Sequence, residues 1–378
     1  MEATTNQAAL NEVVTNKVNR MIESKKPAID AMMNRLINEG NALQDYIAPI
    51  GVKQRNASPA APVITFAANG HVLMNMNNEQ FTMHDNAVSQ LADKMGIPAR
   101  YLRSLSAGDE WQRNLAANIL NEHSGWTPRT RVLIRAVDSE VRAVLSDSYR
   151  RLNSVLLLTA FLEQCINNGA VIADGHMSDT KVFAETLLPQ PIIIPTLKNG
   201  EVLIYAGARF STSDYGDGAV DMRAFLMNGI CTNGLVRESI MKQVHLGSKL
   251  PDNLQLSEKT YELDTATTVS AIRDLSNGLF SRDNIMRKAL EIQGASEIDV
   301  DFDVELKRLV SNGSLIKSES ETVQKIIMNN NPEDGVQGAA TLWKLVNGIT
   351  AAARDASPIR ERELHEISGA LMNRVKLT

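Results

Sequence analysis

Residues Thr127 to Gly169 shape the interpretation of the whole chain, and they read TPRTRVLIRAVDSEVRAVLSDSYRRLNSVLLLTAFLEQCINNG. Two runs of alternating side-chain character, Arg131 to Val137 and Val141 to Ser146, flank a polar turn. Because side chains in a strand point alternately to two faces, these runs predict a β-hairpin. Apolar residues at helical spacing follow, so the segment predicts a hairpin and then a long amphipathic helix that stops at Gly169.

The register of this hairpin depends on its turn. A two-residue turn at Asp138 and Ser139 predicts that Arg135 lies directly opposite Arg142 and that the two faces differ in character. The predicted apolar face comprises Val132, Ile134, Ala136, Val141, Ala143 and Leu145, and the other face comprises Arg131, Leu133, Arg135, Arg142, Val144 and Ser146. Like charges opposite one another destabilise a sheet by up to about 1 kcal/mol, so acids, solvent or a bound anion must offset the repulsion.

The arginines of this segment predict an anion-binding face. Between Arg129 and Arg151 the sequence holds six arginines and three acids. Arginine side chains neutralise phosphates, and an aromatic ring can stack on a base. The alternative is a solvated sheet face on which the arginine stems lie over apolar neighbours. The residues predicted to contact nucleic acid are Arg129, Arg131, Arg135, Arg142, Tyr149, Arg150 and Arg151, with Arg209 and Arg223 as lower-ranked additions.

Composition limits the classes of function. The chain has 378 residues and a formal net charge of -5. Proteins that coat nucleic acid are usually basic overall, so a nucleic-acid role here requires a local basic surface. Aromatic residues make up only 4% of the chain, so platforms for stacking bases should be few. The sequence shows no apolar run of about 18 residues, no secretory signal pattern and no disulfide framework. We therefore expect a cytoplasmic protein without a membrane span.

The chain predicts an α+β fold in four parts. They are a helical segment (1–50), a linker (51–62), an α+β core domain (63–250) and a mostly helical C-terminal region (251–378). The core should contain a central antiparallel sheet, built from hairpins near Val63–Met76, Arg131–Ser146 and Val202–Met227, with helices on one face. Pro27 should kink the helical pattern of the first segment, which runs to about Ile47, or begin a second helix.

Finer features follow from single residues. Asn69-Gly70 predicts the turn of the first hairpin, and Gly207 inside a strand predicts a bulge. The apolar stripe of the N-terminal helix predicts packing on its own domain or on a partner subunit. Two short helices around Gly96 have the outline of a DNA-reading helix-turn-helix, an arrangement that many α/β domains share. We therefore do not predict a groove-reading helix from it.

Candidates for catalysis are few. Nucleotide-binding glycine loops are missing, and the histidines are scattered. Asp299, Asp301 and Asp303 share one face of a predicted strand and could hold a divalent ion, although this alternation is also typical of a half-buried strand. Cys231, beside an Asn-Gly turn, is either a nucleophile or a buried structural cysteine. The trio of Asp174, His176 and Asp179 is either a metal corner or a polar loop, and no cofactor is predicted.

Several blocks of the sequence resemble one family. They are HDNAVSQLADKMGIPARYL (His84 to Leu102), RAVDSEVRAVLSDSYRRLN (Arg135 to Asn153), CTNGLV (Cys231 to Val236) and ATLWKLVNGIT (Ala340 to Thr350). Together they resemble the phage and plasmid proteins catalogued as domain of unknown function 932. The resemblance implies a mobile-element protein that acts in the bacterial cytoplasm. The predicted hairpin and helix also resemble, in topology, the core of phage single-strand annealing proteins, in which a basic groove around an oligomeric ring holds the strand.

The preferred hypothesis is a phage-encoded, homo-oligomeric protein that binds single-stranded DNA and promotes annealing or recombination. This activity would need no catalytic nucleophile and no nucleotide hydrolysis, which agrees with the missing motifs. One alternative is an oligomeric phage structural protein or host-defence antagonist that binds a protein partner. A second alternative is a metal-dependent hydrolase or nuclease that uses the three aspartates or Cys231.

Overall fold

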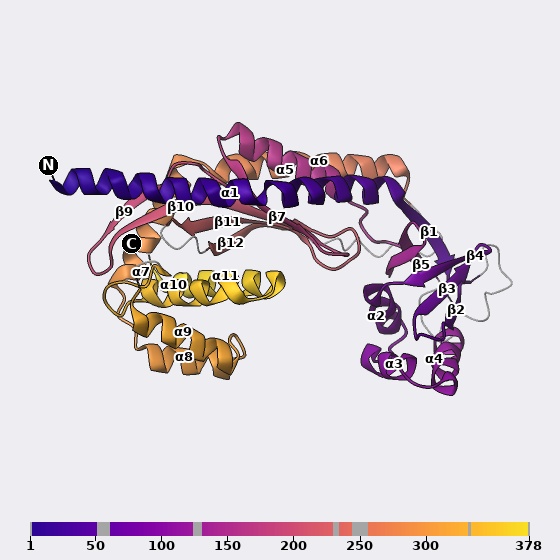
Figure 1. The fold of residues 1–378 in the computed structure, drawn as a ribbon. Helices are drawn as coiled ribbons and strands as arrows, with labels where there is room; N and C mark the ends of the chain where they lie inside the picture. The colour runs from indigo at the N-terminus through magenta and orange to yellow at the C-terminus, as the bar shows by residue number, and fades with distance from the viewer. Residues whose placement is uncertain are drawn as a thin grey trace.

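The computed structural model describes residues 2–50, 61–123, 131–229, 234–243, 256–331 and 334–376. Two sheets with helices on their faces confirm the predicted α+β class. Figure 1 shows an arch, in which two lobes hang from a central layer that contains the second sheet. Within the described ranges, every helix is too short or too polar to span a membrane.

The first sheet and three helices form the N-terminal lobe. The strand order is β1-β5-β6-β4-β3-β2, and β4 pairs with β6 in parallel. The helices cover one face and enclose an apolar core (Figure 1). The elements are β1 (Leu43–Pro49), β2 (Val63–Phe66), β3 (Val72–Met76), β4 (Glu79–Met83), α2 (Asp85–Lys94), α3 (Ala99–Ser106), α4 (Glu110–His123), β5 (Arg131–Val137) and β6 (Glu140–Ser146).

Turn residues explain how β2, β3 and β4 connect. The predicted hairpin around Asn69-Gly70 is confirmed, with Phe66 paired to Val72. The sequence analysis did not predict β4, which follows β3 through Asn77 and Asn78. Both asparagines have positive φ, at 53° and 64°, as a two-residue hairpin turn requires. Asparagine tolerates this conformation better than most residues, so the Asn-Asn pair was an available signal.

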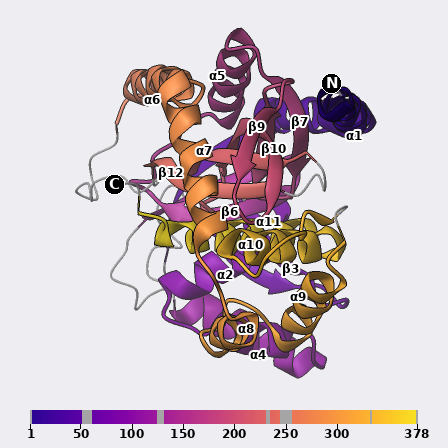
Figure 2. The same cartoon turned by 90° about the vertical axis from the view of Figure 1, so that its left-hand side faces the viewer.

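The second sheet has the order β12-β11-β10-β8-β7, and β9 pairs with one end of β10. Figure 2 shows α5 and α6 on one side of this sheet and the last helices on the other. Asn153 caps α5 by accepting a hydrogen bond from the Leu156 amide, and the predicted helix stop is confirmed at Gly169, which has a φ of 82°. The elements are α5 (Ser154–Asn167), β7 (Val171–Met177), β8 (Val182–Leu187), β9 (Ile192–Thr196), β10 (Gly200–Thr212), β11 (Val220–Asn228), β12 (Gly234–Gln243) and α6 (Glu258–Leu279).

The N-terminal helix connects the two sheets. One helix, α1 (Glu2–Ala42), contains Pro27, so of the two predicted alternatives the second helix is wrong. The predicted helical pattern also ran too far, because β1 begins at Leu43 and pairs with β5. The apolar stripe of α1 packs on its own chain: Val14 and Val18 join a core on the second sheet, and Met32 joins a core with α5.

The C-terminal helices form the other lobe of the arch. They are α7 (Arg282–Glu297), α8 (Phe302–Ser311), α9 (Lys317–Asn329), α10 (Leu342–Ala352) and α11 (Pro358–Leu371), with short 3-10 turns η4 (Ala353–Asp355) and η5 (Met372–Arg374). The predicted strand with three aspartates on one face is wrong. Asp299 makes an isolated bridge to Thr341, Asp301 caps α8, and Asp303 lies inside α8. Helix capping by Asp301 therefore outweighed the alternating pattern.

A bulge changes the register of the arginine hairpin. The turn at Asp138 and Ser139 is confirmed, because Val137 pairs with Glu140. Past Ala136 the register shifts, so Arg135 faces Ala143 and not Arg142. The bulge also turns Val144 toward the lobe core and moves Ala143 and Leu145 to the opposite face. The predicted apolar face therefore holds for β5 and fails for the second half of β6. Separating the two arginines removes the predicted repulsion.

Gly207 lies in the middle of β10, where the sequence predicted a bulge. Gly207 pairs with Phe225 inside the β10–β11 ladder and with Leu187 at the end of the β10–β8 ladder, both without a register shift, so the predicted bulge is wrong. A Cβ atom at this position would lie 1.9 Å from the Thr186 carbonyl oxygen. Glycine is required here because β8 approaches closely, which is the other reason for glycine inside a strand.

We predict that Gly207→Ala destabilises the protein by about 1 to 3 kcal/mol, because the added methyl group displaces β8. Gly278→Ala is the matched control, since no atom lies within 4 Å of its Cβ position in α6. Alanine there should stabilise the protein by up to about 1 kcal/mol. Urea unfolding of both variants is the measurement. Equal effects at the two positions would contradict the steric explanation.

Candidate functional site

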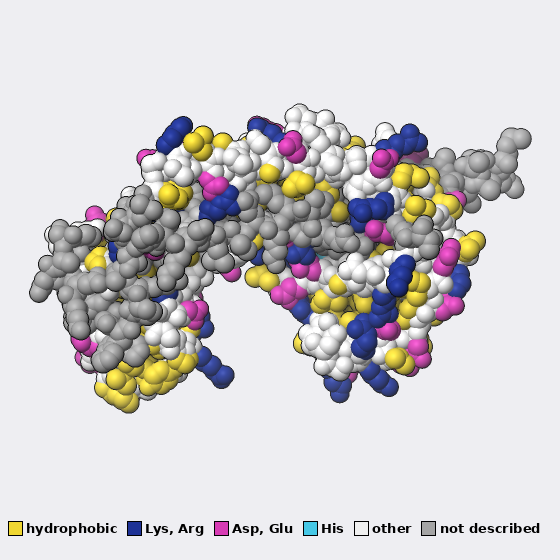
Figure 3. Space-filling model, turned by 180° about the vertical axis from the view of Figure 1, so that it is seen from behind, with side chains coloured by type: hydrophobic (Ala, Val, Ile, Leu, Met, Phe, Trp, Pro, Cys, Tyr) yellow, Lys and Arg dark blue, Asp and Glu magenta, His cyan; other side chains and the backbone are white. Residues whose placement is uncertain are grey.

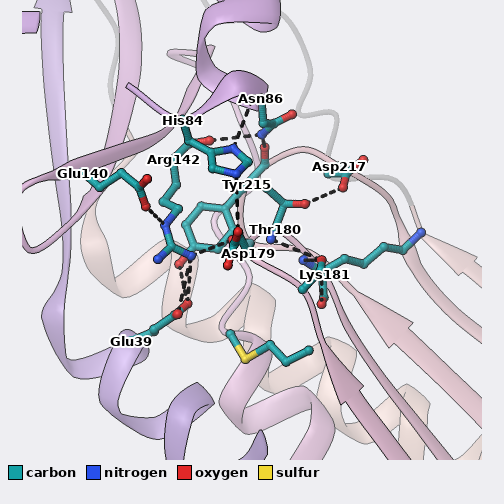
Figure 4. Close-up of polar contacts among 12 residues, drawn as sticks. Glu39, His84, Asn86, Glu140, Arg142, Asp179, Thr180, Lys181, Tyr215 and Asp217 are labelled. Atoms are coloured by element: carbon teal, nitrogen blue, oxygen red, sulfur yellow. Dashed lines mark hydrogen bonds and ion pairs between the residues drawn. The ribbon is translucent and has the colours of Figure 1, made fainter. Parts of the chain in front are cut away.

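The hairpin arginines lie where the N-terminal lobe meets the second sheet. Figure 4 shows this junction, at which Arg142 points away from its bulge toward two other segments. Its Nη1 donates to the Asp179 carbonyl oxygen at 2.7 Å and lies 3.4 Å from the Glu39 carboxylate. Its Nε donates to Glu140. Arg142 thus joins β6, the end of α1 and the β7–β8 turn.

Neighbouring polar groups complete the junction. The Asn86 side chain donates to the carbonyl oxygens of Arg142 and Tyr215, at 3.1 and 3.0 Å (Figure 4). His84 Nε2 lies 3.7 Å from Asp179, and the hydrogen bond from Arg35 lowers the pKa of Asp179. Hydrogen bonds and ion pairs, rather than apolar packing, make these contacts. The paired groups therefore determine the position of the N-terminal lobe on the second sheet.

Arg135 lies deeper in the same contact, with its side chain only 6% exposed. It donates to Asp45 at 2.8 Å and to the Asp214 carbonyl oxygen at 2.7 Å. Burial raises the pKa of Asp214, and the Arg135 charge opposes that effect. Tyr149 is 5% exposed, and its hydroxyl donates to the Ser213 carbonyl oxygen at 3.3 Å. A residue this buried does not offer its ring to a base.

The other predicted arginines also have acidic partners. Arg129 lies outside the described residues. The remaining pairs are Arg131 with Asp147, Arg150 with Asp264, Arg151 with Asp45, Arg209 with Glu185, and Arg223 with Asp221 and Glu366. Three of these acids, Asp264, Asp45 and Glu366, lie more than 100 residues from their arginine, so a count of local acids could not reveal them. The structure does not bring the predicted arginines together on one exposed face.

Arg209 belongs to a buried charged cluster under α11. Its guanidinium lies 2.5 Å from Glu185 and 3.1 Å from His365 Nδ1, and it packs over the Phe225 ring. Burial, with Arg209 and Arg362 adding to it, lowers the pKa of His365 well below the ordinary histidine value. The imidazole is therefore neutral in the folded protein at neutral pH.

A separate surface of the lobe has the residue types that bind nucleic acid. In α3, Leu102 and Leu105 are buried, which leaves Arg100, Tyr101 and Arg103 exposed. Tyr101 is 48% exposed, Trp111 at the start of α4 is 65% exposed, and Leu115 is 37% exposed. In Figure 3 hydrophobic side chains gather at the lower end of this lobe. We call Arg100, Tyr101, Arg103, Trp111 and Leu115 the α3–α4 surface.

Charge distinguishes this surface from the hairpin. Helix α3 reads ARYLRSLS, with two arginines and no acid. Arg103 donates to the Ser89 hydroxyl at 2.6 Å, and among the described residues no ion pair involves Arg100 or Arg103. These residues were not predicted as a binding surface, because the sequence of α2 and α3 was compared only with the helix-turn-helix pattern. Helical spacing around Leu102 and Leu105 was the available signal.

A groove and a pocket are lined by arginines of the junction and of the α3–α4 surface. A groove of about 970 Å³ runs between α5 and α6 and reaches Arg135 and Arg151. Its lining holds three arginines and four acids, so it is not a basic track. A pocket of about 600 Å³ opens in the lobe, between α3, the start of α2 and the β2–β3 turn.

The acids of the candidate metal corner have basic partners. Asp174 lies 3.4 Å from Lys25, and Asp179 pairs with Arg35. Within the described ranges, no group of three or more histidine, cysteine or acidic side chains could hold a metal ion. Cys231 lies outside the described residues. Cys165 is buried, and burial raises its thiol pKa to about 11.

We predict that Arg135→Ala lowers the unfolding free energy by about 3 to 5 kcal/mol, because it takes away the cation beside the buried Asp214 carboxylate and the donor to its carbonyl oxygen. Arg287→Ala changes an exposed arginine of α7 and should stay within about 0.5 kcal/mol of the unchanged protein. Chemical denaturation measures both. A stable Arg135→Ala protein would show that the junction does not depend on this ion pair.

His365 should make stability depend on pH. Its folded-state pKa is lowered, so below about pH 6.5 the unfolded chain binds a proton that the folded chain does not. The unfolding free energy should therefore fall by about 1.4 kcal/mol from this group between pH 7.5 and 5.5. His365→Gln should lack that component, while His71→Gln keeps it. Denaturation at both pH values tests this, and equal slopes for all three proteins would refute it.

Comparison with known proteins supplies no family for this chain. No family model matches the sequence, and neither the curated proteins nor the solved structures contain a match. The resemblance to domain of unknown function 932 stays a prediction from motifs. Function must therefore be argued from the geometry of the chain itself.

Proposed function

We propose that this protein binds single-stranded DNA through the α3–α4 surface of its N-terminal lobe. The observation that carries the proposal is the exposure of Tyr101 and Trp111 beside two arginines without acidic partners in the described chain. Aromatic rings stack on successive bases whatever the sequence, and arginines follow the phosphates between them. The net charge of -5 requires that any basic site be local, and the basic part of this surface is α3, because the exposed acids Asp109 and Glu110 adjoin Trp111.

In this proposal the hairpin arginines have a structural role. Arg135 and Arg142 hold the lobe on the second sheet, and the lobe presents α3 and α4 to the strand. A guanidinium that already donates to carboxylates and carbonyl groups has few donors left for phosphate. The proposal therefore keeps the DNA-binding hypothesis and moves the contact to another surface. Annealing and homo-oligomer formation remain further predictions, since several copies would multiply a modest affinity per subunit.

Binding of a protein partner is the second candidate, because tryptophan, tyrosine and arginine also dominate the energetics of protein interfaces. Leu115, at 37% exposure beside Trp111, favours it, since an aliphatic side chain adds little to base stacking. The two candidates differ in their dependence on salt. Phosphate binding weakens steeply as salt rises, whereas an apolar interface does not.

The decisive experiment is fluorescence anisotropy of a labelled single-stranded oligonucleotide across a salt series. Contacts from Arg100 and Arg103 to two phosphates predict a slope of about -1.4 on logarithmic axes. Tyr101→Ala with Trp111→Ala should weaken binding by roughly tenfold or more, because each lost stack costs about 1 to 3 kcal/mol. Leu197→Ala with Arg287→Ala is the control, since Leu197 is 86% exposed and both residues lie away from the lobe.

Arg131→Ala separates this proposal from the hairpin hypothesis. Its side chain is 23% exposed and pairs with Asp147 on the hairpin itself. Unchanged DNA affinity is expected. If Arg131→Ala weakens DNA binding while Tyr101→Ala with Trp111→Ala does not, the hairpin and not the α3–α4 surface contacts the DNA. If no DNA binds at low salt, the protein-partner candidate is favoured.

A further inference from the structure

The pocket of the N-terminal lobe has the size and lining of a small-ligand site. Its volume is about 600 Å³, within the usual range for such sites. The floor is apolar, and the rim carries polar side chains. The floor comprises Phe66, Val72, Met83, Val88 and Leu102, and the rim comprises Asn69, His71, Thr82, His84, Asp85, Arg103, Ser106 and Glu140.

Arg103 connects this pocket to the α3–α4 surface. It lines the pocket and lies three residues from Arg100, so the two guanidiniums occupy neighbouring positions on one side of α3. A phosphate bound at Arg103 would therefore have its base within reach of the pocket. Bases of a single strand are unstacked easily and can turn away from their neighbours.

The rim chemistry favours particular bases. Asp85 lies in the first turn of α2, and among the described residues no ion pair involves it. Glu140 also lines the pocket and shares its charge with Arg142. Carboxylates accept hydrogen bonds from exocyclic amino groups, as they do from the N4 amino group of cytosine. Thymine has no amino group, and its single N3–H donor lies between the O2 and O4 acceptors, which a carboxylate repels.

We propose that the pocket receives one unstacked, amino-bearing base, such as cytosine or adenine, from a strand held on the α3–α4 surface. This inference rests on the proposed DNA binding and adds a base preference to it. The apolar floor contacts the flat faces of the base, and Asp85 accepts from its amino group. Arg103 holds the adjoining phosphate. The protein would then bind strands in general and favour those that place such a base at the pocket.

Three oligonucleotides test the inference by anisotropy: all-thymidine, the same strand with one central deoxycytidine, and the same strand with one central abasic site. One carboxylate–amino contact predicts roughly fivefold tighter binding of the deoxycytidine strand. The abasic strand should bind like all-thymidine. Asp85→Asn should reduce the preference below about twofold without changing affinity for all-thymidine. Asp93→Asn, at an exposed acid near the end of α2, is the matched control and should keep the preference.

The outcomes separate the two proposals. Equal binding of all three strands by the unchanged protein overturns the base pocket and leaves the DNA-binding surface intact. A preference that persists in Asp85→Asn also overturns it, provided that thermal melting shows a folded variant. A second variant, Val88→Phe, narrows the pocket floor and should abolish the preference. If no strand binds at low salt, the proposed function fails and the pocket inference fails with it.

Discussion

The arrangement of the two halves depends on the enclosed Arg135 guanidinium. It holds Asp45 of β1 with its Nε and the Asp214 carbonyl oxygen of the second sheet with its Nη1. Breaking a buried pair leaves an uncompensated charge, which costs far more than the pair contributes to stability. Moving the lobe off the second sheet would break the hydrogen bond from Arg135 to the Asp214 carbonyl oxygen and would take the Arg135 charge away from the buried Asp214 carboxylate. Arg142, held by Glu39 and the Asp179 carbonyl oxygen, adds a second contact of the same kind.

The path of the chain supports this contact. Helix α1 packs on the second sheet through Val18 and Met32, and the next residues enter the first sheet as β1. One continuous segment thus belongs to both halves. Asp45 lies on β1 directly opposite Arg135, so pairing of the strands also positions the acid. The pairing of β1 with β5 and the attraction between Asp45 and Arg135 consequently favour the same register of the two strands.

Two kinds of arginine must be distinguished in this protein. Those of the hairpin have acids and carbonyl groups around them and stabilise the junction, whereas Arg100 and Arg103 project from a short helix into solvent. The number of arginines in a stretch of sequence does not separate the two kinds. It carries no information on acids and carbonyl groups that are distant in the sequence and contact an arginine only in the folded protein. The proposed DNA contact lies on α3 and α4, and the base pocket lies between α2 and α3, where it meets the junction at His84 and at Glu140, the partner of Arg142.

Local patterns in the sequence determined the class of fold and several of its elements. The two-residue turn at Asp138-Ser139 and the helix end at Gly169 were predicted, because each depends on residues within a few positions. Tertiary structure decided the bulge at Arg142, the close approach that requires Gly207 and the burial of Tyr149. It also decided which arginines are available to a ligand, since Asp45, Asp214 and Asp264 are distant in sequence and reach their partners only after folding.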